Sequence, residues 1–349
     1  MVRNQRTMTP TVSIIVPCRN EEAYIARCLD SIIASDYPKD LLEVVVAEGR
    51  SSDRTREILS AYAATNPGII VLDNPTGSTP AGLNLAIRRA SGDVVIRMDA
   101  HVLYPPDYVR RLVHGLEESG ADNVGGVLET MPAENTPGAR AIAIGLAHPF
   151  GVGNSYFRTG VSARREVDTV PFGCYRREVF ERIGFFDEEL IRNQDDEFNF
   201  RLIRRGGRVL LLPDVLCRYF ARRSLRHLAH MYYQYGYFKP LVARKVGRVM
   251  TVRQLIPAML VASLLGAATL SPWVPGARWA LLLIGVSYVA FVLACSASAV
   301  RTEGLRTGIA LAAVFPTLHF SYGVGFLRGV YQHLLARNAS PAGELGLSR

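Results

Sequence analysis

The fold of this chain is decided by residues 12–34, which read VSIIVPCRNEEAYIARCLDSIIA. Val12–Val16 is a short run rich in β-branched residues, which is typical of a buried strand. Glu21–Ala34 follows with apolar residues at helical spacing, so it predicts an amphipathic helix. The residues between these two segments therefore join the end of a strand to the start of a helix.

The same alternation continues through the first hundred residues. Further strands are predicted at Glu43–Ala47, Ile69–Leu72 and Val94–Met98, and further helices at Arg54–Ala64 and Ala81–Ala90. This rhythm indicates an α/β domain with a mostly parallel sheet covered by helices on both faces. Ligands of such sheets bind beyond the carboxyl ends of the strands.

Three of the predicted strands end in unusual groups. The segments concerned are Pro17–Glu22, Glu48–Thr55 and Asp99–His101. Taken singly, Asn20 or the residues at 51–53 could merely cap a helix, and Asp99 could merely end a strand. Together they place acidic, basic and metal-capable groups along one edge of a sheet, which favours a functional site there.

Composition narrows the class of protein. The five cysteines include no CxxC pair, which fits neither a disulfide framework nor a zinc site, so reduced and buried thiols are expected. Much of the net charge of +9 comes from a basic block at residues 218–253. Nucleic acid is one interpretation of that block. Because the block leads directly into long apolar segments, we expect anionic membrane lipid as the partner and no nucleic acid.

The carboxy-terminal third contains three nearly uncharged runs, Leu255–Leu270, Trp279–Val300 and Ile309–Phe326. A bilayer core needs about 20 apolar residues in a helix, so two or three membrane helices are predicted. Buried core helices are the competing interpretation of these runs. The amino terminus lacks the pattern of a secretory signal. We therefore expect a multi-pass protein of the cell membrane with its first domain in the cytoplasm.

Five ordered motifs carry a family resemblance. They are Val12–Glu21, Ser51–Thr55, Gly82–Ala86, Ala90–Asp93 and Asp99. From Thr11 to Pro213 the chain resembles the inverting glycosyltransferases of family two, which implies the GT-A nucleotide-sugar fold. The segment Met98–His101, combined with a carboxy-terminal membrane region, is similar to the glucosyltransferases of succinoglycan-type exopolysaccharide assembly.

The resemblance assigns a donor site and a metal site. The implied donor-binding residues are Pro17, Arg19, Glu21, Glu48, Asp53, Asn84 and Asp99. The family's Asp-x-Asp motif is replaced here by Asp99-Ala100-His101, so Asp99 and His101 are the implied ligands of a divalent cation. Such a cation stabilises a departing diphosphate, and oxygen-rich sites suit Mg²⁺ or Mn²⁺. His101 could instead be a surface histidine that touches neither metal nor phosphate.

The resemblance also assigns a catalytic base and an acceptor side. The family's Glu-Asp pair corresponds to Gln194-Asp195, which makes Asp195 the expected base and Asp196 the reserve. These acids could alternatively serve only to complement a helix dipole. Gly173, Cys174 and Tyr175 lie in the segment that resembles the acceptor side. The Gln-x-x-Arg-Trp motif of processive synthases is missing its Arg-Trp near residue 234, which argues against processive synthesis.

Four segments are expected along the chain. They are a GT-A domain over residues 1–221, basic amphipathic interfacial helices over 222–253, a membrane region over 254–335 and a polar tail over 336–349. The expected activity is the transfer of a hexose, with UDP-glucose as the expected donor, to a hydroxyl of a polyprenyl-linked saccharide. Alternatives are a polyprenyl-phosphate sugar synthase and a non-catalytic membrane scaffold with a degenerate transferase domain.

Overall fold

The computed structural model describes residues 9–248 and 251–336, so residues 337–349 of the expected polar tail lie outside it. The chain divides into two compact units that are not consecutive in sequence. The sheet unit contains residues 9–128, Val161–Glu188 and Gln194–Arg218. The helical unit contains Glu129–Gly160, Glu189–Asn193 and the residues from Tyr219 onward. Residues 129–160, expected within the transferase domain, thus group with the carboxy-terminal helices.

The sheet unit is built on one mixed sheet. In the described part of the chain its strands are β1 (Val12–Cys18), β2 (Leu42–Glu48), β3 (Ile69–Asp73), β4 (Val94–Arg97), β5 (Val102–Leu103), β6 (Asn123–Met131), β7 (Arg165–Glu166), β8 (Cys174–Arg176) and β9 (Val209–Phe220). Their order is β3-β2-β1-β4-β8-β6-β9-β5, with β7 paired to β9. Strands β3, β2, β1 and β4 are mutually parallel, which confirms the α/β prediction, whereas β8 runs antiparallel to both β4 and β6.

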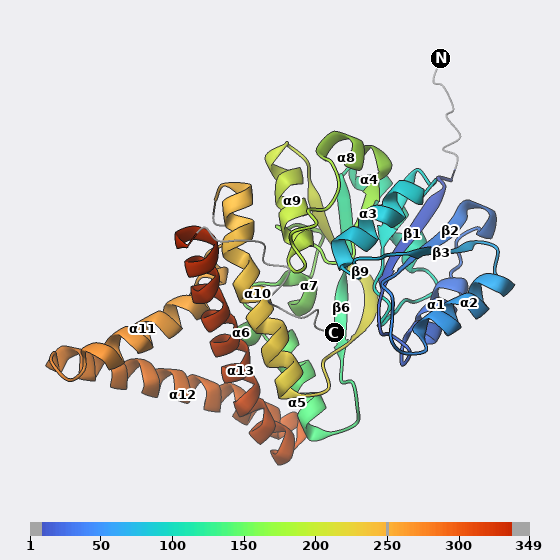
Figure 1. Ribbon diagram of the computed structural model, residues 1–349. Coiled ribbons are helices and arrows are strands. Elements are labelled where there is room, and N and C mark those ends of the chain that lie inside the picture. Colours follow the sequence, from blue (N-terminus) through green and yellow to red (C-terminus); the bar gives the residue numbers. More distant parts are fainter. Residues whose placement is uncertain (1–8, 249–250, 337–349) are drawn as a thin grey trace. The chain divides into compact units, whose positions relative to one another are not determined.

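Helices pack around this sheet, and the first three lie where the sequence patterns predicted them. The helices around the sheet are α1 (Ile25–Ile33), α2 (Thr55–Thr65), α3 (Thr79–Arg89), α4 (Tyr108–Ser119), α8 (Arg177–Ile183) and α9 (Gln194–Arg204) (Figure 1). One boundary differs, because α1 begins at Ile25 and not at the expected Glu21. Asn20 has a positive φ of 53°, which ends the strand in a turn before any helix can start.

The central strand β1 aligns the ends of its two neighbours. Ile14 and Ile15 are completely buried. In the parallel ladder Cys18 lies opposite Glu48 of β2, and Ile15 lies opposite Arg97 of β4. The loops that follow these strands therefore emerge at one edge, as a parallel sheet requires. Four of the five cysteines are buried and none of the five is in a disulfide, as expected.

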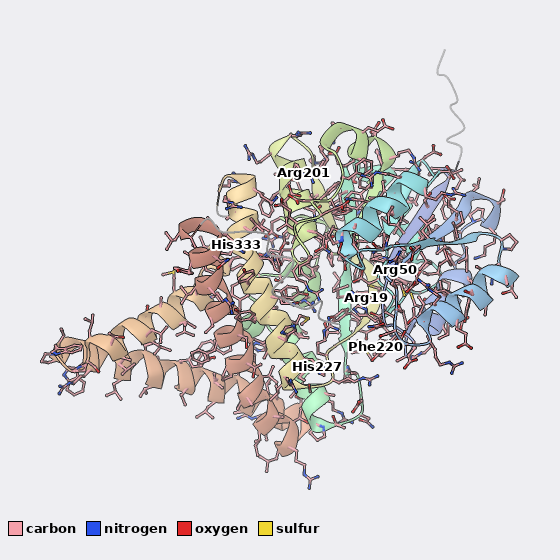
Figure 2. All side chains as sticks on the ribbon, viewed as in Figure 1. Arg19, Arg50, Arg201, Phe220, His227 and His333 are labelled. Carbon is pink, nitrogen blue, oxygen red and sulfur yellow. The ribbon has the colours of Figure 1, made fainter. Side chains whose placement is uncertain are left out.

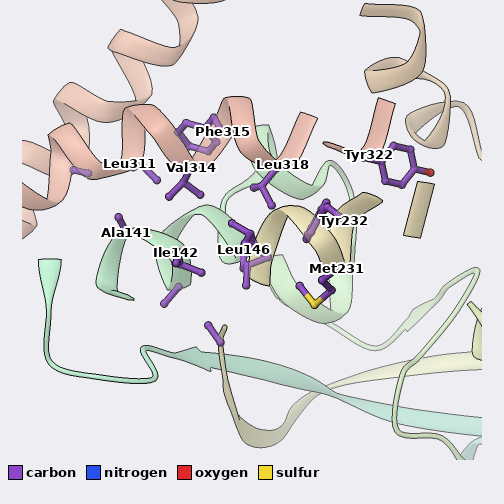
Figure 3. Close-up of a cluster of buried hydrophobic side chains, with 14 of the residues drawn as sticks. Ala141, Ile142, Leu146, Met231, Tyr232, Leu311, Val314, Phe315, Leu318 and Tyr322 are labelled. Carbon is purple, nitrogen blue, oxygen red and sulfur yellow. The ribbon is translucent and has the colours of Figure 1, made fainter. Parts of the chain in front are cut away.

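The helical unit has its own apolar core. Its helices are α5 (Pro137–Ala147), α6 (Pro149–Val152), α7 (Tyr156–Thr159), α10 (Leu225–Val246), α11 (Ile256–Leu270), α12 (Pro275–Glu303) and α13 (Leu305–Val330). Figure 3 shows Ile142 and Leu146 of α5 facing Val314 and Leu318 of α13. This packing explains why residues 129–160 belong to the helical unit.

Glycines allow α10 and α13 to pack backbone against backbone. A side-chain carbon at Gly236 of α10 would overlap the carbonyl oxygen of Tyr322. On α13, a side-chain carbon at Gly325 would overlap the carbonyl oxygen of Tyr233 in the same way. Small residues at such positions let helices approach closely, which strengthens packing where hydrophobic driving force is weak.

Among residues 9–248 and 251–336, three helical segments are long and apolar enough to cross a membrane, judged by length and composition. They are Val252–Leu270, Pro275–Glu303 and Leu305–Leu335. Burial inside the structure is 17% and 11% for the hydrophobic windows of the first two and 44% for that of the third. The first two therefore present their apolar side chains outward, whereas α13 is also a packed element of the helical unit.

Candidate active site

The loops after β1 and β2 are tied to each other at the carboxyl edge of the sheet. The side-chain Oδ1 of Asn20 accepts a hydrogen bond from the Ser52 amide at 2.8 Å. The Glu21 amide in turn donates to the Thr55 hydroxyl at 2.7 Å. Asn20 therefore fixes a loop and does not cap α1, whose N-cap residue is Tyr24. This excludes the simple capping interpretation of Asn20.

Two exposed cations stand at this edge. Arg19 lies over Gly49 and Gly77, where a side-chain carbon at Gly77 would come within 2.7 Å of its Nη1 atom. Arg50 pairs with Asp73 at 3.0 Å. Figure 2 shows both arginines in the sheet unit. Exposed guanidinium groups beside glycine backbone suit an anionic ligand such as a diphosphate.

Three of the other expected donor-site residues are engaged by the protein itself or lie in the sheet. Pro17 is half-buried within the β1–β2 ladder. Glu48 is buried, accepts the Ser51 amide at 2.6 Å and pairs with Arg56 at 2.6 Å. Asp53 accepts the amides of Thr55 and Glu22, at 3.0 Å and 3.2 Å. Burial raises the pKa of Glu48, and these hydrogen bonds outweigh it, so its pKa lies below the usual value.

Asn84 holds α3 against a distant segment. Its amide nitrogen donates to the carbonyl of Phe186 at 2.9 Å and to Glu188 at 2.8 Å, and its amide oxygen accepts from the Phe186 backbone at 2.9 Å. Asn84 is buried at 2% exposure. These contacts give Asn84 a structural role.

The expected base and the expected metal ligand meet around one arginine. Arg97, the last residue of β4, lies only 5% exposed between two carboxylates. It pairs with Asp99 at 3.0 Å and with Asp195, the second residue of α9. A further bond from Arg97 reaches the Pro171 carbonyl at 2.7 Å. Residues about 100 positions apart are thus joined through a single buried guanidinium group.

Burial and charge act against each other at Asp195. Burial is the largest influence and raises the pKa of this carboxyl, and Asp99 and Asp196 raise it further. Arg97 acts in the opposite direction, and the net result is a pKa of about 6. A carboxylate with that pKa is ionised at neutral pH yet basic enough to accept a proton during a reaction. Asp195 therefore has the properties of a general base.

The chemistry of Asp99 and His101 fits a divalent cation. The Nδ1 atom of His101 lies 3.1 Å from Glu21, and metal-bound histidines commonly pair one ring nitrogen with a carboxylate in this way. In the described part of the chain no group of three or more His, Cys, Asp or Glu side chains is arranged to hold a metal. Mg²⁺ and Mn²⁺ sites are commonly completed by substrate phosphates, so two protein ligands suffice.

The expected acceptor-side residues form the strand β8 and its entry. Gly173 is buried, and the space beside it is filled by the ring of Tyr175, so a packing requirement explains the glycine. Cys174 is buried in β8 between β4 and β6. Tyr175 is fully buried, and burial followed by the nearby charge of Asp195 raises the pKa of its hydroxyl.

The helix α9 presents its acids in different directions. Asp196 is half-buried, whereas Glu197 is buried and pairs with Arg201 at 2.8 Å. Arg201 also donates to the carbonyls of Ile183 and Phe185. Glu197 and Arg201 thus fix α9 and leave the first turn to position Asp195.

Arg97 is the residue that the sequence interpretation missed. It stands in a run of otherwise apolar residues, Val94–Met98. Charged side chains are almost never fully buried unless they are paired, so a cation inside a predicted core strand signals a buried acidic partner. That signal was present, but it did not identify the partner.

The chain is similar in sequence to known glycosyltransferases. The family model described as "Glycosyl transferase family 2" matches residues 13–184. The succinoglycan biosynthesis protein ExoA of Rhizobium meliloti is 32% identical over 80% of this chain and 85% of its own. The dolichyl N-acetyl-α-D-glucosaminyl phosphate 3-β-D-2,3-diacetamido-2,3-dideoxy-β-D-glucuronosyltransferase of Methanococcus voltae is 29% identical over 67% of this chain and 74% of its own.

Solved structures share the fold. A mannosyltransferase of Pyrobaculum calidifontis, solved with GDP-mannose and Mn²⁺, has a TM-score of 0.53 at 23% identity and covers 95% of this chain and 89% of its own. S. aureus TarS with UDP-GlcNAc has a TM-score of 0.51 at 17% identity and covers 88% and 91%. These likenesses confirm the GT-A type of sheet. Given the match to ExoA across most of both chains, the protein belongs to glycosyltransferase family 2.

Proposed function

We propose that this glycosyltransferase transfers glucose from UDP-glucose, with inversion, to a hydroxyl of a polyprenyl-linked saccharide at the cell membrane. Membership of family 2 and the similarity to a succinoglycan biosynthesis protein make it an enzyme of polysaccharide or glycan biosynthesis. The donor, the acceptor and the cytoplasmic orientation are the proposed elements. The observation that carries the proposal is the placement of Asp195 beside Asp99 across Arg97.

The proposed chemistry is one direct displacement. Asp195 accepts the proton of the acceptor hydroxyl as that oxygen attacks the anomeric carbon, and the bond to the nucleoside diphosphate breaks on the opposite side. A single displacement inverts the configuration at that carbon. Asp196, on the same turn of α9, is the reserve candidate for the base.

Asp99 and His101 are the proposed ligands of a divalent cation at the donor diphosphate. A bound Mg²⁺ or Mn²⁺ would act as a Lewis acid that stabilises the charge on the leaving group. Arg97 orients the carboxylate of Asp99 through their 3.0 Å contact. Arg19, exposed at the carboxyl end of β1, is proposed to face the anionic donor.

The membrane assignment rests on the helical unit. Three candidate membrane helices belong to this unit, and two of them expose apolar side chains. Arg244 and Lys245 precede the first one, and Arg253 is its second residue. This charge distribution supports a cytoplasmic face next to anionic lipid. A lipid-linked acceptor would meet the enzyme in that plane.

The test measures transfer of radiolabelled glucose from UDP-glucose into the lipid fraction of membranes containing the full chain, with and without Mn²⁺. We expect Asp195→Asn and Asp99→Asn each to reduce transfer by roughly 100-fold or more. Asp40→Asn, at an exposed position, is the matched control and should retain activity.

Each other outcome contradicts a defined part of the proposal. Full activity of Asp195→Asn would indicate a phosphate acceptor, as in a polyprenyl-phosphate sugar synthase, because an ionised phosphate needs no base. Transfer from a different nucleotide sugar alone would overturn the choice of donor. Equal transfer without any divalent cation would contradict the role of Asp99 and His101 as metal ligands.

A further inference from the structure

The helical unit contains two arginines whose charges are not balanced by nearby carboxylates. Among the described residues Arg158, on α7, forms no ion pair, and its Nη1 atom is buried without a hydrogen-bond partner. Arg222, which precedes α10, also forms no ion pair with a described residue. Its Nε donates to the thioether sulfur of Met231 at 3.4 Å, and thioethers are weak acceptors.

The surroundings of Arg158 are aromatic. Its guanidinium carbon lies 5.1 Å from the ring centre of Tyr219 and 5.6 Å from that of Phe157. The rings of Tyr232 and Tyr235 pack against each other with centres 5.6 Å apart. Ring faces attract a cation without neutralising it. Arg158 is therefore a half-buried positive charge among polar aromatic groups.

Two more arginines contact α10 in this region, Arg222 through Met231 and Arg192 through Gln234. Burial raises the pKa of Tyr235, and Arg192, Arg158 and Arg222 all act to lower it. Arg192 is oriented by Gln234, whose amide oxygen accepts from its Nε at 3.0 Å. Like charges gathered in a partly buried region repel one another and lose part of their hydration. Such an arrangement is stabilised when an anion binds between them.

The guanidinium groups of Arg158, Arg192 and Arg222, called the arginine cluster below, favour a phosphate as the bound anion. Guanidinium groups keep their charge at any pH of interest and donate paired hydrogen bonds that match the oxygens of a phosphate. The arginine cluster belongs to the same compact unit as the three candidate membrane helices. A phosphate that is attached to an apolar chain can reach this unit while its chain remains in the bilayer.

We propose that Arg158 and Arg222, with Arg192 and the surrounding tyrosines, bind the diphosphate group of an isoprenoid-linked acceptor. The site deepens the proposed function by locating the charged head of the acceptor lipid in the helical unit. The identification of the bound lipid as the acceptor rests on that proposed function. Binding of an isoprenoid diphosphate to this site does not depend on the proposed function, so the binding site and the proposed function can be refuted separately.

The experiment measures binding of tritiated farnesyl diphosphate to the full chain in phosphatidylcholine nanodiscs, without any donor sugar. Charge-assisted hydrogen bonds predict that Arg158→Gln and Arg222→Gln each raise Kd by roughly 10- to 100-fold. Arg226→Gln removes the same charge from an exposed position four residues beyond Arg222 and should change Kd by less than about twofold. Arg158→Lys keeps a charge without the planar fork and should be intermediate.

Competitors separate the possible sources of phosphate. Farnesol lacks the charged group and should not displace the probe. Inorganic pyrophosphate displacing it as well as unlabelled farnesyl diphosphate would indicate a site for free diphosphate and overturn the lipid assignment. Equal displacement by phosphatidylglycerol would indicate ordinary lipid headgroups and overturn it likewise.

The variants also distinguish a loss of ligand binding from a loss of folding. If Arg158→Gln fails to fold, judged by its thermal melting, Arg222→Gln alone decides, since its guanidinium is held only by a weak acceptor. Equal Kd values for Arg222→Gln, Arg226→Gln and the unchanged protein would refute the site. Loss of farnesyl diphosphate binding with unchanged transfer would separate this site from the acceptor and refute its role there.

Discussion

Replacing Arg97 by methionine tests the link between the buried ion pairs and catalysis. The substitution removes the cation that lies between Asp99 and Asp195 and keeps an unbranched apolar side chain. An opposite charge in direct contact lowers a carboxyl pKa by about 1–3 units, so its removal should raise the pKa of Asp195 by about 2 units. Starting from about 6, the pKa then reaches about 8.

The expected effect on rate follows from the ionised fraction of the base. At pH 7 a carboxyl with a pKa of about 6 is about 90% ionised, and one with a pKa of about 8 is about 10% ionised. We expect Arg97→Met to lower kcat about tenfold at pH 7 and to recover part of it near pH 9. Arg97→Lys keeps the charge and should shift the profile less.

The assay is the pH dependence of kcat for transfer into lipid, measured at saturating donor and acceptor. Thermal melting of each variant shows whether the protein remains folded, because removing one partner of a buried pair costs about 3–5 kcal/mol. An acidic limb that stays near pH 6 in a folded Arg97→Met protein would refute the electrostatic role of Arg97.

Three further predictions follow from single features of the structure. The kcat of the unchanged protein should fall about tenfold per pH unit below about 6, as Asp195 becomes protonated, and a limb lying wholly below pH 5 would contradict Asp195 as the base. Gly236→Ala should lower the free energy of unfolding by roughly 1–3 kcal/mol because the new carbon meets the backbone of Tyr322, whereas Gly266→Ala, facing open space, should not; thermal melting in detergent compares the two. Asn84→Ala should cost roughly 1–3 kcal/mol in the same assay, because buried backbone groups lose their partner, and a neutral result would argue against its structural role.

Local sequence features anticipated the framework of the sheet unit. Two-residue periodicity in short β-branched runs and helical periodicity between them depend only on near neighbours, and β1 to β4 lie where those patterns placed them. The three apolar runs likewise correspond to the three candidate membrane helices, because hydrophobic length is a property of contiguous sequence. The start of α1 was placed four residues early, because a loop contact at Asn20 overrides helix propensity.

The candidate site was only partly visible from the sequence. Asp99 and Asp195 were singled out by resemblance, and the position of Arg97 in an apolar strand indicated a buried acidic partner without identifying either of them. Residues 129–160 were expected with the transferase domain, but α5 packs on α13 because their apolar faces match.

By itself the sequence determined the alternating α/β framework, the carboxyl edge on which polar groups gather and the apolar segments of membrane length. Only the tertiary structure decided that Arg97 is shared by Asp99 and Asp195, and that Arg158 and Arg222 belong to one region of the helical unit. The physical reason is that periodicity records the burial of each segment against its immediate surroundings. Which distant charges then come into contact depends on how whole strands and helices pack, and that information is spread over every residue in the packed interfaces.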